Sequence, residues 1–323
     1  MKARWRVLVS APYMIPFPEE YRRHLEEHDI EVGVVQVNER LDERELLPLI
    51  ADVDGVICGD DEFTARVLEG APRLKIISKW GTGIDSIDRE AAARLDIKVG
   101  STPDAFTDAV ADSTLGYVLA FARKLPWMDG DVRSGRWRKP SCLALKECNL
   151  GVIGVGHIGK TVVKRAVAFG MRVLGNDIEA IEGAFVERTG LEVTDKASLL
   201  RQSDFVTLHC DLNATSYHLM DGGAFDIMRP SSILINTARG SIVDEAALVH
   251  ALRTRKIAGA ALDVFEIEPL PESSPLRTLS NVLLAPHNSN NSVEARRRVH
   301  ENTIHNLLIG LGVQPKPREP AVG

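Results

Sequence analysis

The 323-residue sequence predicts an α/β protein built from two doubly wound domains, each with a parallel sheet. Three observations predict this fold class. Short apolar, β-rich runs alternate with helical patterns along the whole chain. These runs form two sets, one before residue 100 and one after residue 150. A glycine-rich turn, Gly154–Gly159, lies between a strand pattern and a helix pattern near the middle of the chain.

The first set of elements covers about the first hundred residues. The expected strands are Arg6–Ser10, Val32–Val37, Gly55–Cys58, Leu74–Ser78 and Ile97–Val99. Helical patterns between them include Glu43–Ala51 and Arg66–Glu69, the second closed by Gly70. This alternation is typical of a small doubly wound domain.

The second set begins near residue 150. Its expected strands are Gly151–Val155, Arg172–Gly175, Phe205–His209, Ser232–Asn236, Gly259–Val264 and Val282–Leu284. A long helical pattern, Thr107–Arg123, joins the two sets, and a closing one, Val293–Leu311, can cross back to the first. We therefore expect a domain of residues 107–287 inserted into a discontinuous domain of residues 1–106 and 288–323.

Bulk properties indicate a globular protein, with 44% hydrophobic and 26% charged residues. The net charge of −6 gives no general attraction to nucleic acid or to an anionic membrane, so we expect neither as a partner. Two short basic clusters, Arg133–Lys139 and Arg296–Arg298, are interpreted as solvated or subunit-facing surface. The run Val7–Val9 is too short for a signal peptide, and we expect a cytoplasmic protein.

The cysteines predict neither a metal site nor a disulfide framework. Cys58, Cys142, Cys148 and Cys210 show no paired metal-ligand spacing. Buried thiols in a reducing compartment are the expected state.

The motif Gly154-x-Gly156-x-x-Gly159 predicts a dinucleotide site, because it follows a strand pattern and opens a helix pattern. The first glycine permits a tight turn, the second lets the backbone approach a pyrophosphate, and the third lets helix and strand pack closely. The N-terminus of the helix supplies free N–H donors. An ordinary glycine-rich turn is the alternative, and it leaves the acidic end of the next strand unexplained.

That acidic strand end is Asp177, eighteen residues after the last glycine of the motif. A carboxylate at this position accepts hydrogen bonds from the adenosine ribose. It would repel a 2′-phosphate, and the following Ile178-Glu179-Ala180 carries no cation. The pattern therefore favours NAD over NADP.

Three later strand patterns end in residues suited to acid–base chemistry. Arg239 follows the first, Glu268 the second and His287 the third. Ligands of open α/β sheets lie beyond the carboxyl ends of strands, so these side chains are expected at one edge. Oxidation of a hydroxy acid needs three groups of these types. A cation binds the substrate carboxylate, a base removes the hydroxyl proton, and an anion stabilises the base once it is charged.

Each residue also has a structural alternative. Arg239 could be surface in a helix-capping loop before Asp244, and a lone histidine is more often structural than catalytic. Asp263, in the second of these segments, is placed to accept a hydrogen bond from a cofactor amide.

Taken together, these segments resemble the D-isomer-specific 2-hydroxyacid dehydrogenase family over almost the full length. The matching segments, in order, are Gly81-Thr82-Gly83-Ile84-Asp85, Thr102-Pro103, the glycine motif, Asn236–Gly240, Asp263–Pro269 and Pro286-His287. The resemblance implies a Rossmann NAD-binding domain inserted into a flavodoxin-like substrate domain. It also implies a homodimer through residues 125–140, which include Trp137.

The family implies Arg239, Glu268 and His287 as the catalytic trio. Residues implied to contact NAD are Gly154, Gly156, His157, Ile158, Gly159, Asp177, His209, Cys210, Thr237, Ala238, Arg239, Asp263, His287 and Asn290. Residues implied to contact the substrate are Trp80, Gly81, Thr82, Gly83, Arg239 and His287. The substrate is expected between the domains, with its carboxylate on Arg239 and the turn Gly81–Gly83.

The implied reaction moves a hydride between C2 of a D-2-hydroxy acid and the nicotinamide. His287 exchanges the hydroxyl proton, and Glu268 pairs with its imidazolium, which raises the histidine pKa. Formate dehydrogenases of the same fold carry glutamine at the position of Glu268, so glutamate favours a hydroxy acid. The D configuration is expected from the resemblance alone.

Several positions depart from the family pattern. Asn288–Ser292 replaces the usual isoleucine and small residues after His287, Asp112 replaces a common glutamate, and Phe106, a core residue or a specificity residue, stands where asparagine is common. Phosphoglycerate dehydrogenases often carry an arginine in the loop that here reads Cys58–Glu62, and this acidic loop is expected to repel a phosphate. Arg138 or Lys139 of a neighbouring subunit is the alternative cation.

Two alternatives remain open at this point. One is phosphoglycerate dehydrogenase itself, although we expect neither its C-terminal regulatory domain nor control by serine. The other is an NAD(H)-sensing scaffold like the C-terminal-binding-protein corepressors, which retain the trio. Steady NADH oxidation with a 2-keto acid separates an enzyme from a scaffold. The sequence does not identify which 2-hydroxy acid is used.

Overall fold

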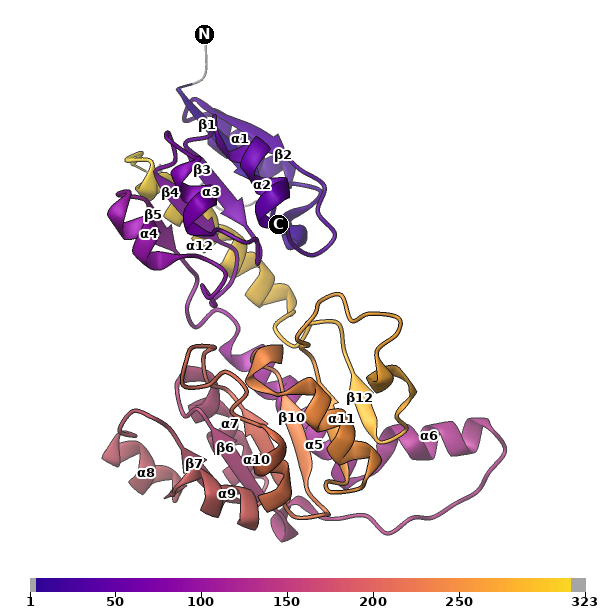
Figure 1. Ribbon diagram of the computed structural model, residues 1–323. Helices are drawn as coiled ribbons and strands as arrows, with labels where there is room; N and C mark the ends of the chain where they lie inside the picture. The colour runs from indigo at the N-terminus through magenta and orange to yellow at the C-terminus, as the bar shows by residue number, and fades with distance from the viewer. Residues whose placement is uncertain (1–3, 315–323) are drawn as a thin grey trace. The chain divides into compact units, whose positions relative to one another are not determined.

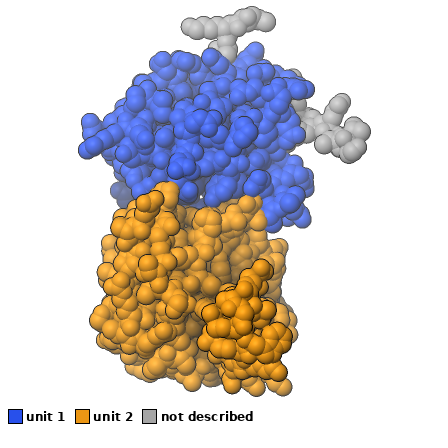
Figure 2. All heavy atoms as spheres, turned by 90° about the vertical axis from the view of Figure 1, so that its right-hand side faces the viewer, with its two compact units in different colours: residues 1–105, 292–323 blue, residues 106–291 orange. Residues whose placement is uncertain are grey.

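The computed structural model describes residues 4–314. The chain divides into two compact units, shown in different colours in Figure 2. Unit 1 comprises residues 1–105 and 292–323, and unit 2 comprises residues 106–291. The expected insertion, residues 107–287, lies within unit 2. A substrate-binding role for unit 1 stays a prediction.

Unit 1 contains a five-stranded parallel sheet in the order β2-β1-β3-β4-β5. Its strands are β1 (Trp5–Val9), β2 (Ile30–Val34), β3 (Gly55–Cys58), β4 (Ile76–Lys79) and β5 (Lys98–Gly100). Its helices are α1 (Glu19–Glu26), α2 (Glu43–Ile50), α3 (Ala65–Glu69), α4 (Arg89–Arg94) and α12 (Val293–Gly310). Helix α12, drawn in yellow in Figure 1, packs on β3, β4 and β5.

Close packing of α12 depends on glycine. A Cβ on Gly310 would lie 2.4 Å from the side chain of Ile76, and one on Gly55 would lie 2.8 Å from Leu307. The C-terminal helix therefore belongs to the core of unit 1, as its helical pattern suggested.

One expected strand of unit 1 is displaced. Val32–Val37 was expected, whereas β2 covers Ile30–Val34 and pairs in parallel with β1 from Trp5 to Val9. Because β1 ends at Val9, the chain after Val34 has no further strand to pair with. The extent of the neighbouring strand, and not the local run of valines, sets the end of β2.

Unit 2 contains a seven-stranded parallel sheet in the order β12-β11-β10-β9-β6-β7-β8 (Figure 1). Its strands are β6 (Asn149–Ile153), β7 (Arg172–Asn176), β8 (Glu192–Val193), β9 (Phe205–Leu208), β10 (Ile233–Asn236), β11 (Gly259–Leu262) and β12 (Val282–Leu284). Its α-helices are α5 (Thr107–Ala122), α6 (Leu125–Arg133), α7 (His157–Ala168), α8 (Gly183–Thr189), α9 (Lys196–Gln202), α10 (Gly222–Ile227) and α11 (Glu245–Arg253).

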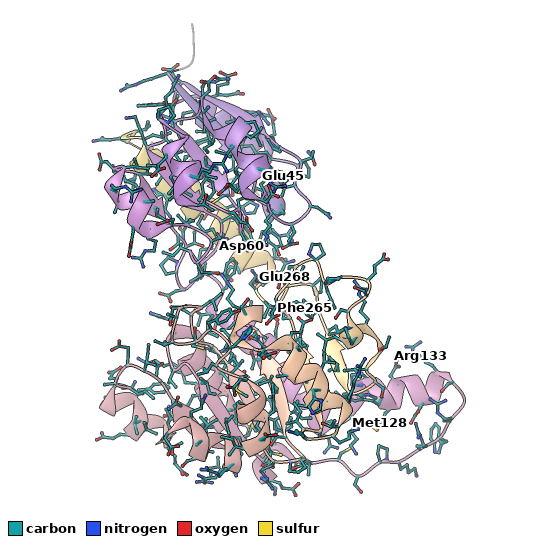
Figure 3. All side chains as sticks on the ribbon, viewed as in Figure 1. Glu45, Asp60, Met128, Arg133, Phe265 and Glu268 are labelled. Atoms are coloured by element: carbon teal, nitrogen blue, oxygen red, sulfur yellow. The ribbon has the colours of Figure 1, made fainter. Side chains whose placement is uncertain are left out.

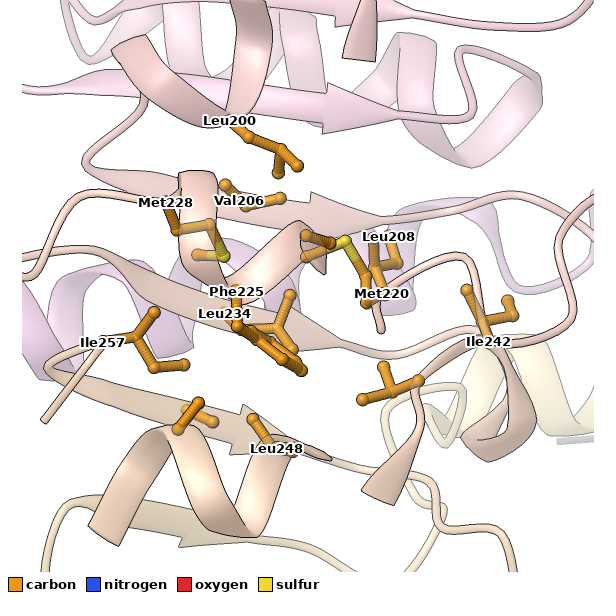
Figure 4. Close-up of a cluster of buried hydrophobic side chains, with 14 of the residues drawn as sticks. Leu200, Val206, Leu208, Met220, Phe225, Met228, Leu234, Ile242, Leu248 and Ile257 are labelled. Atoms are coloured by element: carbon orange, nitrogen blue, oxygen red, sulfur yellow. The ribbon is translucent and has the colours of Figure 1, made fainter. Parts of the chain in front are cut away.

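The core of unit 2 lies on both faces of this sheet. Along β10, Leu234 joins the cluster that includes Phe225 and Leu248, drawn in Figure 4, whereas Ile233 and Ile235 join the cluster on the other face. Burial on both faces explains why the strands read as continuous apolar runs.

The strand order reverses between β6 and β9. In doubly wound sheets the ligand crevice lies at such a reversal, beyond the carboxyl ends of the strands. The segments that follow β6, β9, β10, β11 and β12 all leave this edge, because every strand pair in the sheet is parallel.

Two further observations concern the surroundings of the protein. No helix among the described residues is both long and apolar enough to cross a membrane. The four cysteines form no disulfide; Cys58 and Cys148 are buried as expected, whereas Cys142 and Cys210 are half-buried.

Candidate active site

The glycine turn after β6 has the geometry that its motif predicts. Gly154 has a φ of 88°, and a Cβ there would lie 2.4 Å from the backbone nitrogen of Cys210. A Cβ on Gly159 would lie 2.0 Å from the carbonyl oxygen of Gly154. No described atom lies within 4 Å of a Cβ built on Gly156. The first and third glycines thus permit internal packing, and the second leaves the backbone open to a ligand.

The turn leads directly into the N-terminus of α7. Gly156 is the N-cap and offers no side-chain cap, so the first amides of α7 receive no capping hydrogen bond from it. Asp177, after β7, accepts hydrogen bonds from the amides of Val155 at 2.6 Å and Glu179 at 3.0 Å. Its carboxylate is therefore fixed beside the turn, and each oxygen retains a lone pair for a ribose hydroxyl. These residues fit a dinucleotide.

His209 and Cys210, which follow β9, are uncharged residues next to the glycine turn. The ring nitrogen Nε2 of His209 lies 2.9 Å from the hydroxyl of Thr207, and burial lowers the pKa of His209 to about 3. Burial also raises the pKa of the Cys210 thiol to about 11. Both side chains are therefore neutral near pH 7.

The segment after β10 is held by one buried amide side chain. Asn236, 1% exposed, donates from Nδ2 to the carbonyl of Arg239 at 2.8 Å and accepts from the amide of Ala238 at 3.0 Å. Asn236 thereby holds the backbone that carries Arg239. The hydroxyl of Thr237 lies 3.4 Å from that of Thr114 in α5.

Glu268 and His287 form a direct pair. Nδ1 of His287 donates to Oε2 of Glu268 at 2.8 Å, and Oε1 of Glu268 accepts from the amide of Phe265 at 2.8 Å. Phe265 and Glu268 are labelled in Figure 3. The side chains of His287 and Glu268 are 19% and 21% exposed. The carboxylate on Nδ1 fixes the orientation of the imidazole ring and the tautomer in which Nδ1 carries a proton.

A close backbone contact joins the segments of Arg239 and Glu268. A Cβ on Gly240 would lie 1.9 Å from the carbonyl carbon of Phe265. Only glycine permits this approach. The structure therefore joins the strand ends of β10, β11 and β12, as the sequence predicted from their shared edge.

Asp263 has a role that the sequence did not indicate. It is 1% exposed, and its two carboxylate oxygens accept from the amides of Asn288 at 2.9 Å and Ser289 at 2.8 Å. The bond to a cofactor amide that the sequence suggested stays a prediction, because each carboxylate oxygen keeps a second lone pair. The structure shows that this carboxylate holds the loop after His287.

The predicted substrate contacts of unit 1 follow β4. Trp80 is 4% exposed, donates from Nε1 to Nδ1 of His300 at 2.9 Å and stacks on Tyr13. The carbonyl of Gly81 accepts from the amide of Thr102 at 2.9 Å, and Thr82 donates to the carbonyl of Thr102 at 3.2 Å. Packing of Trp80 thus fixes the start of the turn Gly81–Gly83, whose substrate contacts stay predictions.

The acidic loop after β3 is less repulsive to anions than its sequence suggested. Asp60 pairs with the buried Lys79 at 3.0 Å, and Glu62 pairs with Arg40 at 3.2 Å. Asp61 accepts a hydrogen bond from the amide of Leu41 at 2.7 Å, and burial raises its pKa. The charge of this loop therefore gives little reason to exclude a phosphorylated substrate.

Charged side chains in the segment that includes α6 form ion pairs with one another. Asp131 binds both Arg136 and Arg138, and the hydrogen bond from Arg138 is the main cause that lowers the Asp131 pKa to about 2. Arg138 therefore already has a carboxylate partner within its own chain, which weakens its case as a cation for a neighbouring subunit. Trp137, between the two arginines, is 79% exposed.

A family model confirms the expected relationship. Residues 115–289 match the model described as "D-isomer specific 2-hydroxyacid dehydrogenase, NAD binding domain". The match covers more than half of the chain and the whole of the glycine turn, Arg239, Glu268 and His287.

Curated relatives and solved structures agree with this match. The chain is 41% identical over 280 residues to a glyoxylate reductase of Thermofilum pendens, covering 84% of this chain and 83% of that protein. It is 41% identical over 271 residues to a D-3-phosphoglycerate dehydrogenase of Methanocaldococcus jannaschii, covering 83% of this chain and 51% of that protein. A D-lactate dehydrogenase of Aquifex aeolicus, solved with NAD and lactic acid, superposes with a TM-score of 0.83 at 26% identity, covering 93% of each chain.

Proposed function

Because the chain belongs to the D-isomer specific 2-hydroxyacid dehydrogenase family, we propose that it interconverts a small D-2-hydroxy acid and its 2-keto acid with NAD. It is an NAD-dependent oxidoreductase.

The observation that carries the proposal is the hydrogen bond between His287 and Glu268, next to the segment of Arg239. A carboxylate on Nδ1 selects the tautomer in which Nε2 is the acidic or basic atom. It also stabilises the imidazolium that forms when a hydroxyl proton is taken up.

Bound NAD supplies the nicotinamide carbon that accepts or donates the hydride. During oxidation, Nε2 of His287 removes the hydroxyl proton, and Glu268 holds the resulting imidazolium. During reduction, the same nitrogen returns the proton to the oxygen at C2. Positioned acid–base catalysis of this kind contributes about 10²- to 10⁴-fold to the rate.

Arg239 is assigned to the substrate carboxylate, which its guanidinium can grip with two parallel hydrogen bonds. Backbone amides of Gly81–Gly83 are assigned to the same carboxylate, because Thr82 is exposed and Gly83 is half-buried in this turn after β4. Trp80 and Thr82 are assigned a positioning role for that turn.

The glycine turn and the first amides of α7 are assigned to the cofactor diphosphate, and Asp177 to the adenosine ribose. His209, Cys210, Thr237, Ala238 and Asn290 are proposed to line the remainder of the NAD site. Asp177 favours NAD over NADP, because its carboxylate would face the extra phosphate.

Phosphoglycerate is the second candidate substrate, since the acidic loop of unit 1 is neutralised by Lys79 and Arg40. A small unphosphorylated keto acid remains the first, because Lys79 and Arg40, the two cations beside that loop, are each paired with one of its carboxylates. A homodimer through residues 125–140 is also proposed, since this segment exposes Leu125, Val132 and Trp137.

A panel of keto acids with NADH tests the function. Glyoxylate, hydroxypyruvate, pyruvate, a branched keto acid and 3-phosphohydroxypyruvate are compared by loss of NADH absorbance. We expect turnover of about 1 s⁻¹ or more with at least one unphosphorylated acid. Preference for the phosphorylated acid would support the second candidate, and no turnover with any would indicate a scaffold.

A further inference from the structure

We propose that His300 and Asn306 of α12 are positioning residues for the turn Gly81–Gly83, which the proposed function assigns to the substrate carboxylate. His300 holds the residue that precedes the turn, and Asn306 holds the strand end to which the turn is hydrogen-bonded. The inference rests on the proposed function, and it adds two residues that act on the substrate through this turn.

One face of α12 binds the carboxyl ends of two neighbouring strands of unit 1. Nδ1 of His300 accepts a hydrogen bond from Nε1 of Trp80, directly after β4, at 2.9 Å. Nδ2 of Asn306 donates to the carbonyl of Ser101, directly after β5, at 2.9 Å. Helix α12 packs along both strands (Figure 1).

A third hydrogen bond lies between these two. The carbonyl of Thr303 accepts from the hydroxyl of Ser78, in β4, at 2.7 Å. His300, Thr303 and Asn306 are three residues apart, and residues at this spacing lie on the same side of a helix. The helix therefore holds β4 and the segments after β4 and β5 through one row of hydrogen bonds.

The turn is tied to both of the segments that α12 holds. The carbonyl of Gly81 accepts from the amide of Thr102 at 2.9 Å, and the hydroxyl of Thr82 donates to the carbonyl of Thr102 at 3.2 Å. Thr102 directly follows Ser101, and Gly81 directly follows Trp80. A movement of either residue that α12 holds would therefore reach the turn through a single peptide bond.

The indole of Trp80 is held on its face as well as at its nitrogen. Its ring stacks on that of Tyr13, with centroids 4.5 Å apart and planes 17° apart. The ring of His300 meets the indole edge-on, with centroids 5.8 Å apart. Trp80 is 4% exposed, so loss of the acceptor on His300 would be costly for a buried N–H group.

His300 acts here as a neutral acceptor. It is 7% exposed, and burial lowers its pKa to about 4. Near pH 7 the ring is therefore uncharged, and Nδ1 keeps the lone pair that the indole N–H requires. A glutamine at position 300 also offers an uncharged acceptor, whereas a leucine offers none.

The test compares H300L with H300Q, and I304V is the control for packing. Ile304 is a buried apolar residue of the same helix, and its loss of one methylene destabilises unit 1 without removing a hydrogen bond. In H300L we expect KM for the keto acid to rise about five- to ten-fold, as loss of one hydrogen bond allows. In H300Q and I304V it should stay within about two-fold of the wild-type value.

The division between KM and kcat separates positioning from general damage. A contact that holds the carboxylate equally in the ground state and the transition state changes KM and leaves kcat nearly unchanged. We therefore expect kcat of H300L within about two-fold of wild type and NADH affinity unchanged in a fluorescence titration. A purely structural role predicts a lower melting temperature of H300L with a wild-type KM, and that result would overturn the proposal.

Asn306 gives a second test, which decides if H300L does not fold. N306A removes the donor to Ser101, and N302A removes an exposed asparagine of the same helix as its matched control. We expect KM for the keto acid to rise about three- to five-fold in N306A and to stay unchanged in N302A. Equal KM values in the two variants would contradict the positioning role.

Failure of this inference differs from failure of the proposed function. If R239K raises KM while H300L and N306A do not, the carboxylate site stands and the role of α12 is wrong. If the wild-type protein turns over no keto acid, the proposed function is wrong and this inference falls with it.

Discussion

Replacing Glu268 by glutamine removes the charge that faces His287 and keeps a side chain of the same shape. Glu268 contacts Nδ1 of His287 at 2.8 Å and the amide of Phe265 at 2.8 Å, and glutamine can still accept one of these bonds. E268Q should therefore fold, because it loses an electrostatic interaction and no packing volume.

The size of the effect follows from the geometry. Opposite unit charges about 4 Å apart interact by about 4 kcal/mol at an effective dielectric constant of 20 and by about 1 kcal/mol in water. Because the two side chains are 19% and 21% exposed, an intermediate value applies. Removal of the Glu268 charge should therefore weaken the hold on the imidazolium by about 2 kcal/mol.

The assay is the pH dependence of kcat/KM for keto-acid reduction. Reduction needs the imidazolium, so activity falls as pH rises through the pKa of His287. A lower pKa moves this alkaline limit to lower pH, by about 1 to 2 units in E268Q. The matched control is E266Q, which removes a carboxylate two residues away that pairs with His218 and not with His287. The E266Q profile should coincide with that of the wild type, and an E268Q profile that also coincides with it would contradict the role given to Glu268.

Three further predictions concern binding and stability. R239K should raise KM for the keto acid by about 10- to 100-fold with little change in NADH affinity, since lysine cannot form the two parallel bonds. G154A should lower the melting temperature, because its Cβ would lie 2.4 Å from the nitrogen of Cys210, whereas G156A should keep it and weaken NADH binding in a fluorescence titration. Burial lowers the pKa of His300 in the folded protein to about 4. As pH falls below 6.5, His300 therefore takes up a proton in the unfolded chain before it does so in the folded protein, and this favours unfolding. The free energy of unfolding of unit 1, measured by urea titration of the whole wild-type chain, should therefore fall by about 2 kcal/mol between pH 6.5 and 5. It should fall by less in H300Q, and equal decreases would contradict this.

The two-sheet fold followed from periodicity, because strands buried on both faces form long apolar runs between glycine-rich turns. The lengths of the strands and the presence of the shortest elements could not be predicted from this periodicity. The end of β2 depends on β1, and β8 contains only Glu192–Val193, too short for a pattern. Helix α1 buries only Tyr21 and Leu25 in an otherwise charged run, so its apolar signal is weak.

The candidate site was predictable to the extent that it depends on strand ends. Parallel strands deliver their carboxyl ends to one edge, which placed Arg239, Glu268 and His287 together in advance. The supporting contacts were not predictable, because they join segments far apart in the chain. Gly240 against Phe265 and Asp263 against the loop after His287 are examples.

Electrostatics was the least predictable part from sequence. The run Asp60-Asp61-Glu62 indicated a repulsive loop, but Lys79 and Arg40 neutralise two of its carboxylates from other elements. Partners of this kind come from tertiary structure, and a charge pattern along the chain does not contain them.

The substitution H287A tests the central claim most directly. NADH affinity is measured by fluorescence and turnover by NADH consumption with the best keto acid of the panel. We expect turnover to fall by at least about 100-fold while NADH affinity is retained. Turnover equal to that of the wild-type protein would contradict it.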